Sequence, residues 1–153
     1  MPHVLIIEDM YLFQQYLTDI ARLAGATSFA VASTQDEAIA AARSRMPSLI
    51  LSDIKLAHGS GVTAIERIIA DCGSIPVVYI TGYPERCHLS AGPFALLTKP
   101  VTADLLLETI AAFLGNPAPC IGMSGHPDDL VVVPPIPLGG TNDYYVGSSA
   151  SRP

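Results

Sequence analysis

Five polar residues stand at or just after the ends of four short apolar runs, and their types suit phosphoryl chemistry. After the runs 4–7, 49–51, 77–80 and 94–97 come, in order, Glu8 with Asp9, Asp53, Thr81 and Lys99. If these runs are strands of one open parallel sheet, their carboxyl ends lie at the edge where ligands of such sheets bind. The spacing therefore predicts a site in which an aspartate accepts a phosphoryl group.

The residue types predict a separate role for each group. Phosphoryl transfer to a carboxylate needs a nucleophilic oxygen, a divalent cation and positive or hydrogen-bonding groups around the transferred oxygens. Asp53 is the predicted nucleophile, and Glu8 and Asp9 add the hard oxygen ligands that Mg2+ prefers. Lys99 compensates charge, and the Thr81 hydroxyl donates to a phosphoryl oxygen. Because three crowded carboxylates repel one another, we expect Mg2+ to stabilise the protein.

The elements that must position these groups alternate along residues 1–115. Continuously apolar runs are typical of strands covered on both faces, and they alternate with segments whose apolar residues recur at helical spacing. The predicted strands are residues 3–7, 28–32, 49–52, 76–80 and 94–97. Such alternation predicts an α/β fold with a doubly wound parallel sheet and right-handed crossovers.

Helix boundaries are also encoded locally. Ser33 or Thr34 can cap the second predicted helix, and Thr102 can cap the last one, because their hydroxyls accept hydrogen bonds from the first turn. Gly25 and Gly115 supply the C-terminal stops of the first and last helices.

Two segments lack a sustained pattern. Residues 83–93 are bounded by prolines and hold few apolar residues at helical spacing, which predicts a short or irregular fourth helix in a mobile segment. Residues 116–153 are rich in Pro, Gly and Ser, which predicts a disordered tail. The expected division is a folded domain over residues 1–115 followed by this tail.

Composition excludes several classes of protein. About half of the 153 residues are hydrophobic, enough for one core, and the formal net charge is -6 with no basic block, which argues against nucleic-acid binding. The three cysteines form no C-x-x-C pair and suit a reducing compartment. No leader precedes the first strand and no apolar stretch reaches ~20 residues, so we expect a cytoplasmic protein without membrane contact.

Two expectations concern the surface. The histidines lack metal-ligand spacing, and all four are expected at the surface: His3, His58, His88 and His126. The apolar face of the last helix, with Leu105, Leu107 and Leu114, exceeds what one core covers. This leaves a homodimer open as a minority hypothesis.

Residues 1 to about 115 resemble the receiver domain of two-component response regulators. The resemblance is carried by residues that match the family's motif in order and spacing: Glu8, Asp9, Asp53, Thr81, Lys99 and Pro100. It implies the flavodoxin-like receiver fold, with strand order 2-1-3-4-5, and a cis peptide before Pro100. The segments 53–61 and 79–86 further resemble receivers of alphaproteobacterial regulators, including those of the general stress response.

The resemblance also implies chemistry and partners. A histidine kinase or histidine phosphotransfer protein would phosphorylate Asp53, with Mg2+ held by Asp9, Asp53 and the backbone carbonyl of Lys55. The favoured function is a stand-alone response regulator of a phosphorelay that signals through an unknown downstream protein. It is expected to assist only its own phosphorylation and dephosphorylation and not to be an enzyme otherwise.

Two alternatives stay open at this point. One is a pseudo-receiver, an interaction module that works without phosphate. The other, less favoured, is a haloacid-dehalogenase-like phosphatase, which also uses an aspartate nucleophile but expects a second aspartate two positions later, where this chain has Lys55.

Departures from the family pattern predict how the switch works. Leu96 occupies the position of the usual aromatic residue three before the lysine, so we expect phosphorylation to reorder Thr81 and residues 83–92 instead. Lys55 and Tyr83 lie two residues after Asp53 and Thr81. Their bulk would hinder the attacking water, which predicts slow hydrolysis of the acyl phosphate.

Overall fold

One parallel sheet organises the chain. The structure, a computed structural model, describes residues 1–83 and 94–115. The five strands lie in the order β2-β1-β3-β4-β5, as expected. They are β1 (His3–Ile7), β2 (Ser28–Ala32), β3 (Leu49–Ser52), β4 (Val77–Thr81) and β5 (Phe94–Thr98).

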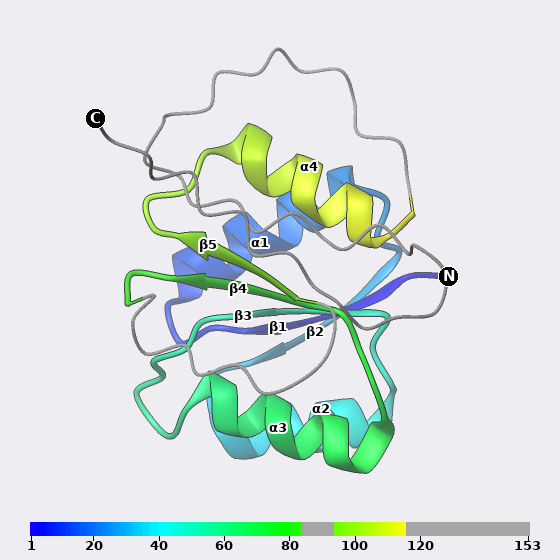
Figure 1. The fold of residues 1–153 in the computed structure, drawn as a ribbon, viewed down its shortest axis with the longest axis vertical. Coiled ribbons are helices and arrows are strands. Elements are labelled where there is room, and N and C mark those ends of the chain that lie inside the picture. The colour runs from blue at the N-terminus through cyan, green and yellow to red at the C-terminus, as the bar shows by residue number, and fades with distance from the viewer. Residues whose placement is uncertain (84–93, 116–153) are drawn as a thin grey trace, which may run out of the picture.

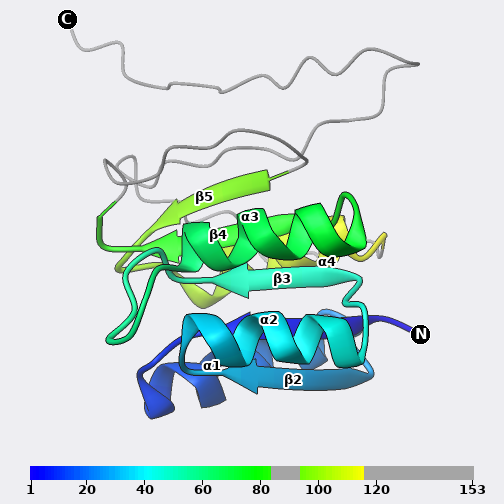
Figure 2. The same ribbon diagram turned by 90° about the horizontal axis from the view of Figure 1, so that it is seen from below.

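Helices cover both faces of the sheet. They are α1 (Tyr11–Leu23), α2 (Gln35–Ser44), α3 (Gly61–Cys72) and α4 (Ala103–Phe113). In Figure 1, α1 and α4 lie on one face, and α2 and α3 lie on the other. Figure 2 shows α2 and α3 side by side across the strands. The predicted doubly wound α/β fold is confirmed.

The central strand β1 shows how the sheet divides the core. All five of its residues are buried. Val4 and Ile6 belong to the apolar cluster beneath α1 and α4, whereas Leu5 and Ile7 belong to the cluster beneath α2 and α3. Because successive side chains of a strand point to opposite faces, a continuously apolar run fills both layers.

The helix ends follow the predicted capping chemistry. The Thr34 hydroxyl accepts from the Glu37 N–H, and the Thr102 hydroxyl accepts from the Leu105 N–H. Gly25 has a φ of 107° just after α1, where its N–H donates to the Arg22 carbonyl. This left-handed conformation favours glycine and ends the helix.

The expected surface position of His3 is wrong. Its exposed fraction is 5%, and its Nδ1 lies 2.8 Å from the Ser28 hydroxyl on β2. Because β1 is covered on both faces, even its polar first residue is buried, and the neighbouring strand supplies its hydrogen-bond partner. His58 is exposed as expected, and the other two histidines lie outside the described residues.

The last helix is better covered than its composition predicts. Leu107 is buried, and Leu105 and Leu114 pack against the cluster beneath α1 and α4. This covering removes the reason given for a homodimer through α4. The expected fourth helix and tail lie outside the described residues. Within residues 1–83 and 94–115, no helix has the length and apolar character that crossing a membrane requires.

Candidate functional site

The predicted site residues all belong to one edge of the sheet, toward which every arrowhead points (Figures 1 and 2). Backbone hydrogen bonds tie the strand ends together there. The Asp53 N–H donates to the Ile7 carbonyl at 2.9 Å, and the Lys99 N–H donates to the Thr81 carbonyl at 2.8 Å. Both β4 and β5 run one residue further than predicted, so Thr81 is the last residue of β4.

Three carboxylates form the acidic part of this edge. Glu8, Asp9 and Asp53 each offer one oxygen, and these oxygens all lie within 4.8 Å of one another. They come from two neighbouring strand ends, because β1 pairs with β3 in register from Val4 to Ile7. The Lys99 ammonium completes the cluster: Nζ lies 3.1 Å from Glu8 Oε2 and 3.2 Å from Asp53 Oδ2.

Charge in this cluster is only partly balanced. If all four groups are ionised, three carboxylates and one ammonium leave a formal charge of -2. Burial raises the pKa of Glu8, whose exposed fraction is 1%, while the Met10 N–H and Lys99 act in the opposite direction. The site therefore favours a further cation, since a buried carboxylate needs compensation.

Asp9 and Asp53 are held by the loop between β3 and α3. The Ala57 N–H donates to Asp9 Oδ2 at 2.8 Å, and the Ile54 N–H donates to Asp53 Oδ1 at 2.6 Å. The Lys55 N–H lies 3.4 Å from the same Asp53 oxygen. These donors orient the carboxylates, because hydrogen bonds to ionised acceptors are stronger than neutral ones.

Gly61 fixes the start of α3 against the acceptor strand. A Cβ on Gly61 would lie 1.8 Å from the Asp53 carbonyl oxygen. The Gly61 N–H also donates to the Ile54 carbonyl at 2.9 Å. The absence of a side chain thus allows α3 to begin directly beside Asp53. The glycine was not singled out from the sequence, although it lies eight residues after the acceptor.

Gln14 was also missed by sequence reasoning. It lies on α1 with an exposed fraction of 7%. Its Nε2 donates to the Glu8 carbonyl and to the Ser33 hydroxyl. A polar residue on the buried face of a predicted helix is the signal that could have found it.

Thr81 and Leu96 occupy the β4–β5 side of the edge. The buried Thr81 hydroxyl accepts from the Tyr83 N–H at 3.0 Å. Leu96 is buried in the cluster beneath α2 and α3, opposite Tyr79 of β4 in register. Most of the segment expected to reorder, residues 84–92, lies outside the described residues.

The residues at this edge fit Mg2+ in their chemistry. Carboxylate oxygens are the hard donors that this ion prefers, and it is usually held by one or two carboxylates. Both Glu8 oxygens already accept hydrogen bonds, from Met10 N–H and Lys99 Nζ. Both Asp53 oxygens also accept hydrogen bonds, from Ile54 N–H and Lys99 Nζ, so these contacts do not rank the carboxylates as ligands of the ion. These roles, and that of the Lys55 carbonyl, stay predictions.

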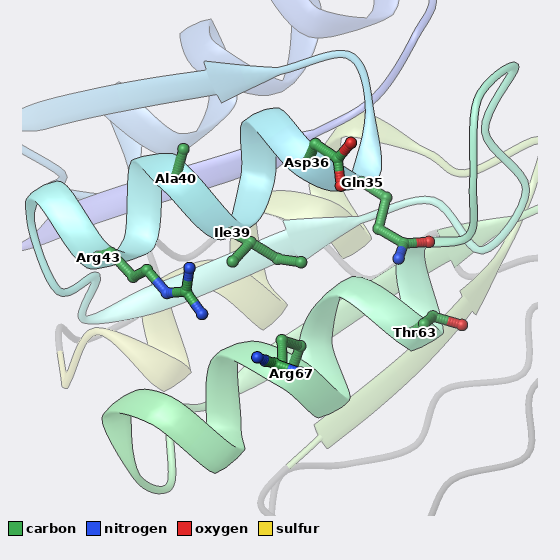
Figure 3. Close-up of a pocket in the computed structure, with 7 residues that line it drawn as sticks. All are labelled: Gln35, Asp36, Ile39, Ala40, Arg43, Thr63 and Arg67. Atoms are coloured by element: carbon green, nitrogen blue, oxygen red, sulfur yellow. The ribbon is translucent and has the colours of Figure 1, made fainter.

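A hollow of about 490 Å3 lies elsewhere, between α2 and α3 (Figure 3). Its lining residues are Gln35, Asp36, Ile39, Ala40, Arg43, Thr63 and Arg67. Arg43 Nε also donates a hydrogen bond to Asp71 Oδ2 on α3. Because it has neither the clustered carboxylates nor the lysine, this hollow does not carry the chemistry of the sheet edge.

The peptide before Pro100 is cis, as the family resemblance implies. Comparisons with known proteins agree with that resemblance. The sequence profile of the response regulator receiver domain matches residues 4–111. The phyllosphere-induced regulator PhyR of Methylorubrum extorquens is 41% identical over 101 residues, which cover 63% of this chain and 38% of that protein. This chain thus spans well under half of that relative's length.

Two further matches cover nearly the whole of the compared protein. The polar-differentiation response regulator DivK of Brucella ovis is 30% identical over 119 residues, 74% of this chain and 96% of DivK. The solution structure of the PhyR response regulator REC domain of Erythrobacter litoralis is 36% identical, with a TM-score of 0.66, and covers 74% of this chain and 90% of that one. This chain therefore belongs to the response regulator receiver domain family.

Proposed function

We propose that this chain accepts a phosphoryl group on Asp53 in a Mg2+-dependent reaction. The observation that supports this most directly is the position of Lys99, whose ammonium bonds both the candidate acceptor and Glu8. A lysine shared by two carboxylates can turn to a phosphoryl oxygen once one of them has reacted. The two-component phosphorelay role of the family agrees with this chemistry.

In the proposed reaction an Asp53 carboxylate oxygen forms a bond to phosphorus. The bond between phosphorus and the donor breaks, and the donor leaves with the electron pair. Bound Mg2+ would neutralise charge on the transferred oxygens. Lys99 then pairs with a phosphoryl oxygen, and the Thr81 hydroxyl donates to another. Asp9, Asp53, the Lys55 carbonyl and, indirectly, Glu8 would hold the ion.

The phosphoryl donor is proposed to be a histidine kinase or histidine phosphotransfer protein. Three apolar residues that follow Asp9 support a docking surface for it: Met10, Tyr11 and Leu12 are 60%, 68% and 80% exposed. Consecutive exposed apolar side chains beside a reactive group are typical of a protein-binding surface. A protein donor bound there would lie next to the acceptor.

Residues 1–115 are proposed to form the receiver unit, with residues 116–153 outside it. Phosphorylation would be read by a downstream protein through contacts with this unit, in the cytoplasm and without nucleic acid. Because the PhyR match covers only 38% of that protein, we propose for this chain only phosphorylation of the receiver and no other activity of PhyR. The family match gives no support to a haloacid-dehalogenase-like phosphatase.

The test is phosphorylation of the full chain by acetyl phosphate with and without Mg2+, followed by intact-mass spectrometry. Wild type should gain one phosphoryl group only with Mg2+, and Asp53→Asn should gain none. Asp19→Asn is the matched control, because Asp19 is an exposed aspartate on α1, paired with Arg22. Its phosphorylation should equal that of wild type. An unmodified wild type would favour the pseudo-receiver alternative.

A further inference from the structure

Lys99 has a third neighbour besides its two carboxylates, and this neighbour is an aromatic ring. Its Nζ lies 4.2 Å from the centroid of the Phe13 ring on α1. A cation within about 6 Å of a ring face is attracted by the electron-rich face. The ammonium is therefore held both by carboxylates, one of which would change charge in the reaction, and by a ring that would not.

The Phe13 ring is itself well positioned. It is half-buried in the first turn of α1 and packs against the cluster beneath α1 and α4. One turn further on, the Tyr16 ring lies 5.6 Å away between centroids, at an interplanar angle of 34°. Burial and then the Asp104 carboxylate of α4 raise the pKa of Tyr16. The ring pair thus connects Lys99 to the α1–α4 layer.

We propose that Phe13 is a positioning residue that keeps the Lys99 ammonium at the pocket when phosphoryl transfer consumes the Asp53 carboxylate. Lysine has a flexible four-carbon stem, so an ammonium left with Glu8 alone would sample more rotamers. The Phe13 ring limits this freedom, so the ammonium meets the incoming phosphoryl oxygen already oriented. Its role in the reaction rests on the proposed function, whereas the geometry can be tested without it.

The sequence makes the geometric test simple, because it contains only two lysines, Lys55 and Lys99. Labelling lysine with 13C at the ε carbon gives two methylene signals in an NMR spectrum of the full chain, assigned with Lys55→Arg. Protons above a ring face are shifted upfield. Phe13→Leu should move the Lys99 signal downfield and leave Lys55 in place, and Phe13→Tyr should restore it. An unmoved Lys99 signal in Phe13→Leu overturns the proposal.

Phe29→Leu is the matched control. Phe29 lies on β2, packs against the same apolar cluster and carries the Arg22 guanidinium 5.3 Å from its ring centroid. Its loss removes a similar ring with a similar cation contact, on the strand at the opposite side of the sheet from β5, which Lys99 follows. The Lys99 signal should stay unchanged in this variant. A shift equal to that in Phe13→Leu would mean a general packing effect and would overturn the proposal.

The second arm measures phosphorylation by acetyl phosphate with Mg2+. Phe13→Leu should lower the maximal rate roughly three- to tenfold, as expected for losing one cation–ring contact. The donor concentration at half-maximal rate should not change, and Phe13→Tyr and Phe29→Leu should react like wild type. A wild-type rate in Phe13→Leu overturns the positioning role. If wild type itself is not phosphorylated, the proposed function fails, and the NMR arm alone decides the position of Phe13.

Discussion

The amino edge of the sheet, where the strands begin, and the carboxyl edge, where they end, treat their polar groups in opposite ways. At the amino edge, His3 is buried beside two serine hydroxyls: its ring Nδ1 lies near Ser28 Oγ, and its backbone N–H donates to Ser48 Oγ at 3.3 Å. Burial and then the Arg45 charge lower its pKa, which favours the neutral ring. At the carboxyl edge, three carboxylates share one ammonium. The amino edge therefore gives its buried histidine hydrogen-bond partners, whereas the carboxyl edge retains excess negative charge.

The difference shows that the carboxyl edge, and not the amino edge, lowers the stability of the folded protein when no cation is bound. A neutral, hydrogen-bonded histidine can be buried with little penalty, because its polar atoms keep partners. Crowded carboxylates raise the free energy of the folded state unless a cation binds. Active sites commonly keep such perturbed groups, since binding and chemistry need charge that is not already neutralised.

Of the changes considered, removing the Lys99 ammonium should have the largest effect on the carboxyl edge. Lys99→Met leaves Glu8 buried without its cation and removes one of the two proposed donors to the phosphoryl oxygens. We expect the acetyl phosphate reaction to slow by about 10²–10³-fold, as when one preorganised donor is lost. Radiolabel or intact-mass time courses measure this rate. Lys55→Met, at the only other lysine, should change the rate far less, and equal losses in both variants would contradict the role of Lys99.

Binding of a cation should neutralise the excess negative charge of the carboxyl edge and so reduce its difference from the amino edge. Mg2+ at 100 times its dissociation constant should stabilise the fold by about 2.7 kcal/mol, which raises the thermal midpoint by several degrees. Asp9→Asn should lose most of this gain, whereas the exposed Asp19→Asn should keep it. Differential scanning fluorimetry with and without Mg2+ measures the effect. A gain that survives in Asp9→Asn would mean that the ion binds elsewhere.

A smaller effect is expected at the mouth of the carboxyl edge. The Lys55 ammonium lies 5.2 Å from the centroid of the Tyr83 ring, so the two residues expected to hinder water lie together. Losing this contact in Lys55→Ala should shorten the acyl-phosphate lifetime about two- to fivefold. The decay of purified phosphoprotein measures it. Arg22→Ala, which removes the contact with Phe29, should leave the lifetime unchanged.

The smallest effect is expected at the amino edge. Because the pKa of folded His3 is lowered, the unfolded chain takes up a proton first as pH falls below the ordinary value of 6.5. This uptake stabilises the unfolded state, so the His3 contribution is complete above pH 6.5 and declines as pH falls from there through the folded pKa. Urea denaturation at pH 7.5 and 5.5 should show a smaller loss of stability in His3→Gln than in wild type. Equal losses in wild type and His3→Gln would contradict a contribution from His3.

Local and periodic signals predicted most of the fold. Apolar runs such as 4–7 gave the strands, and Thr34, Thr102 and Gly25 gave the helix ends, because these effects depend on a few neighbouring residues. The sheet edge at which Glu8, Asp53 and Lys99 meet followed from strand direction. Their chemical roles stay predictions.

What could not be predicted depends on contacts between distant segments. The partner of His3 lies 25 residues away on β2, and the ring that contacts the Lys99 ammonium belongs to Phe13, on the first helix of the chain. Gly61 was not singled out, since its closeness to the Asp53 carbonyl depends on the path of the loop between them. Hydrophobic periodicity predicts on which face of a helix or strand a residue lies, but it does not predict which residue of another element it contacts.

The tight approach at Gly61 has a mechanical consequence. With no room for even a methyl group between this residue and the Asp53 carbonyl, the acceptor backbone and the first turn of α3 cannot move toward each other. Any shift of the acceptor in that direction must push the whole helix, which is stiff along its axis. The α3 surface is thus coupled to the acceptor without an intervening side chain, and an alanine at position 61 would wedge the two apart.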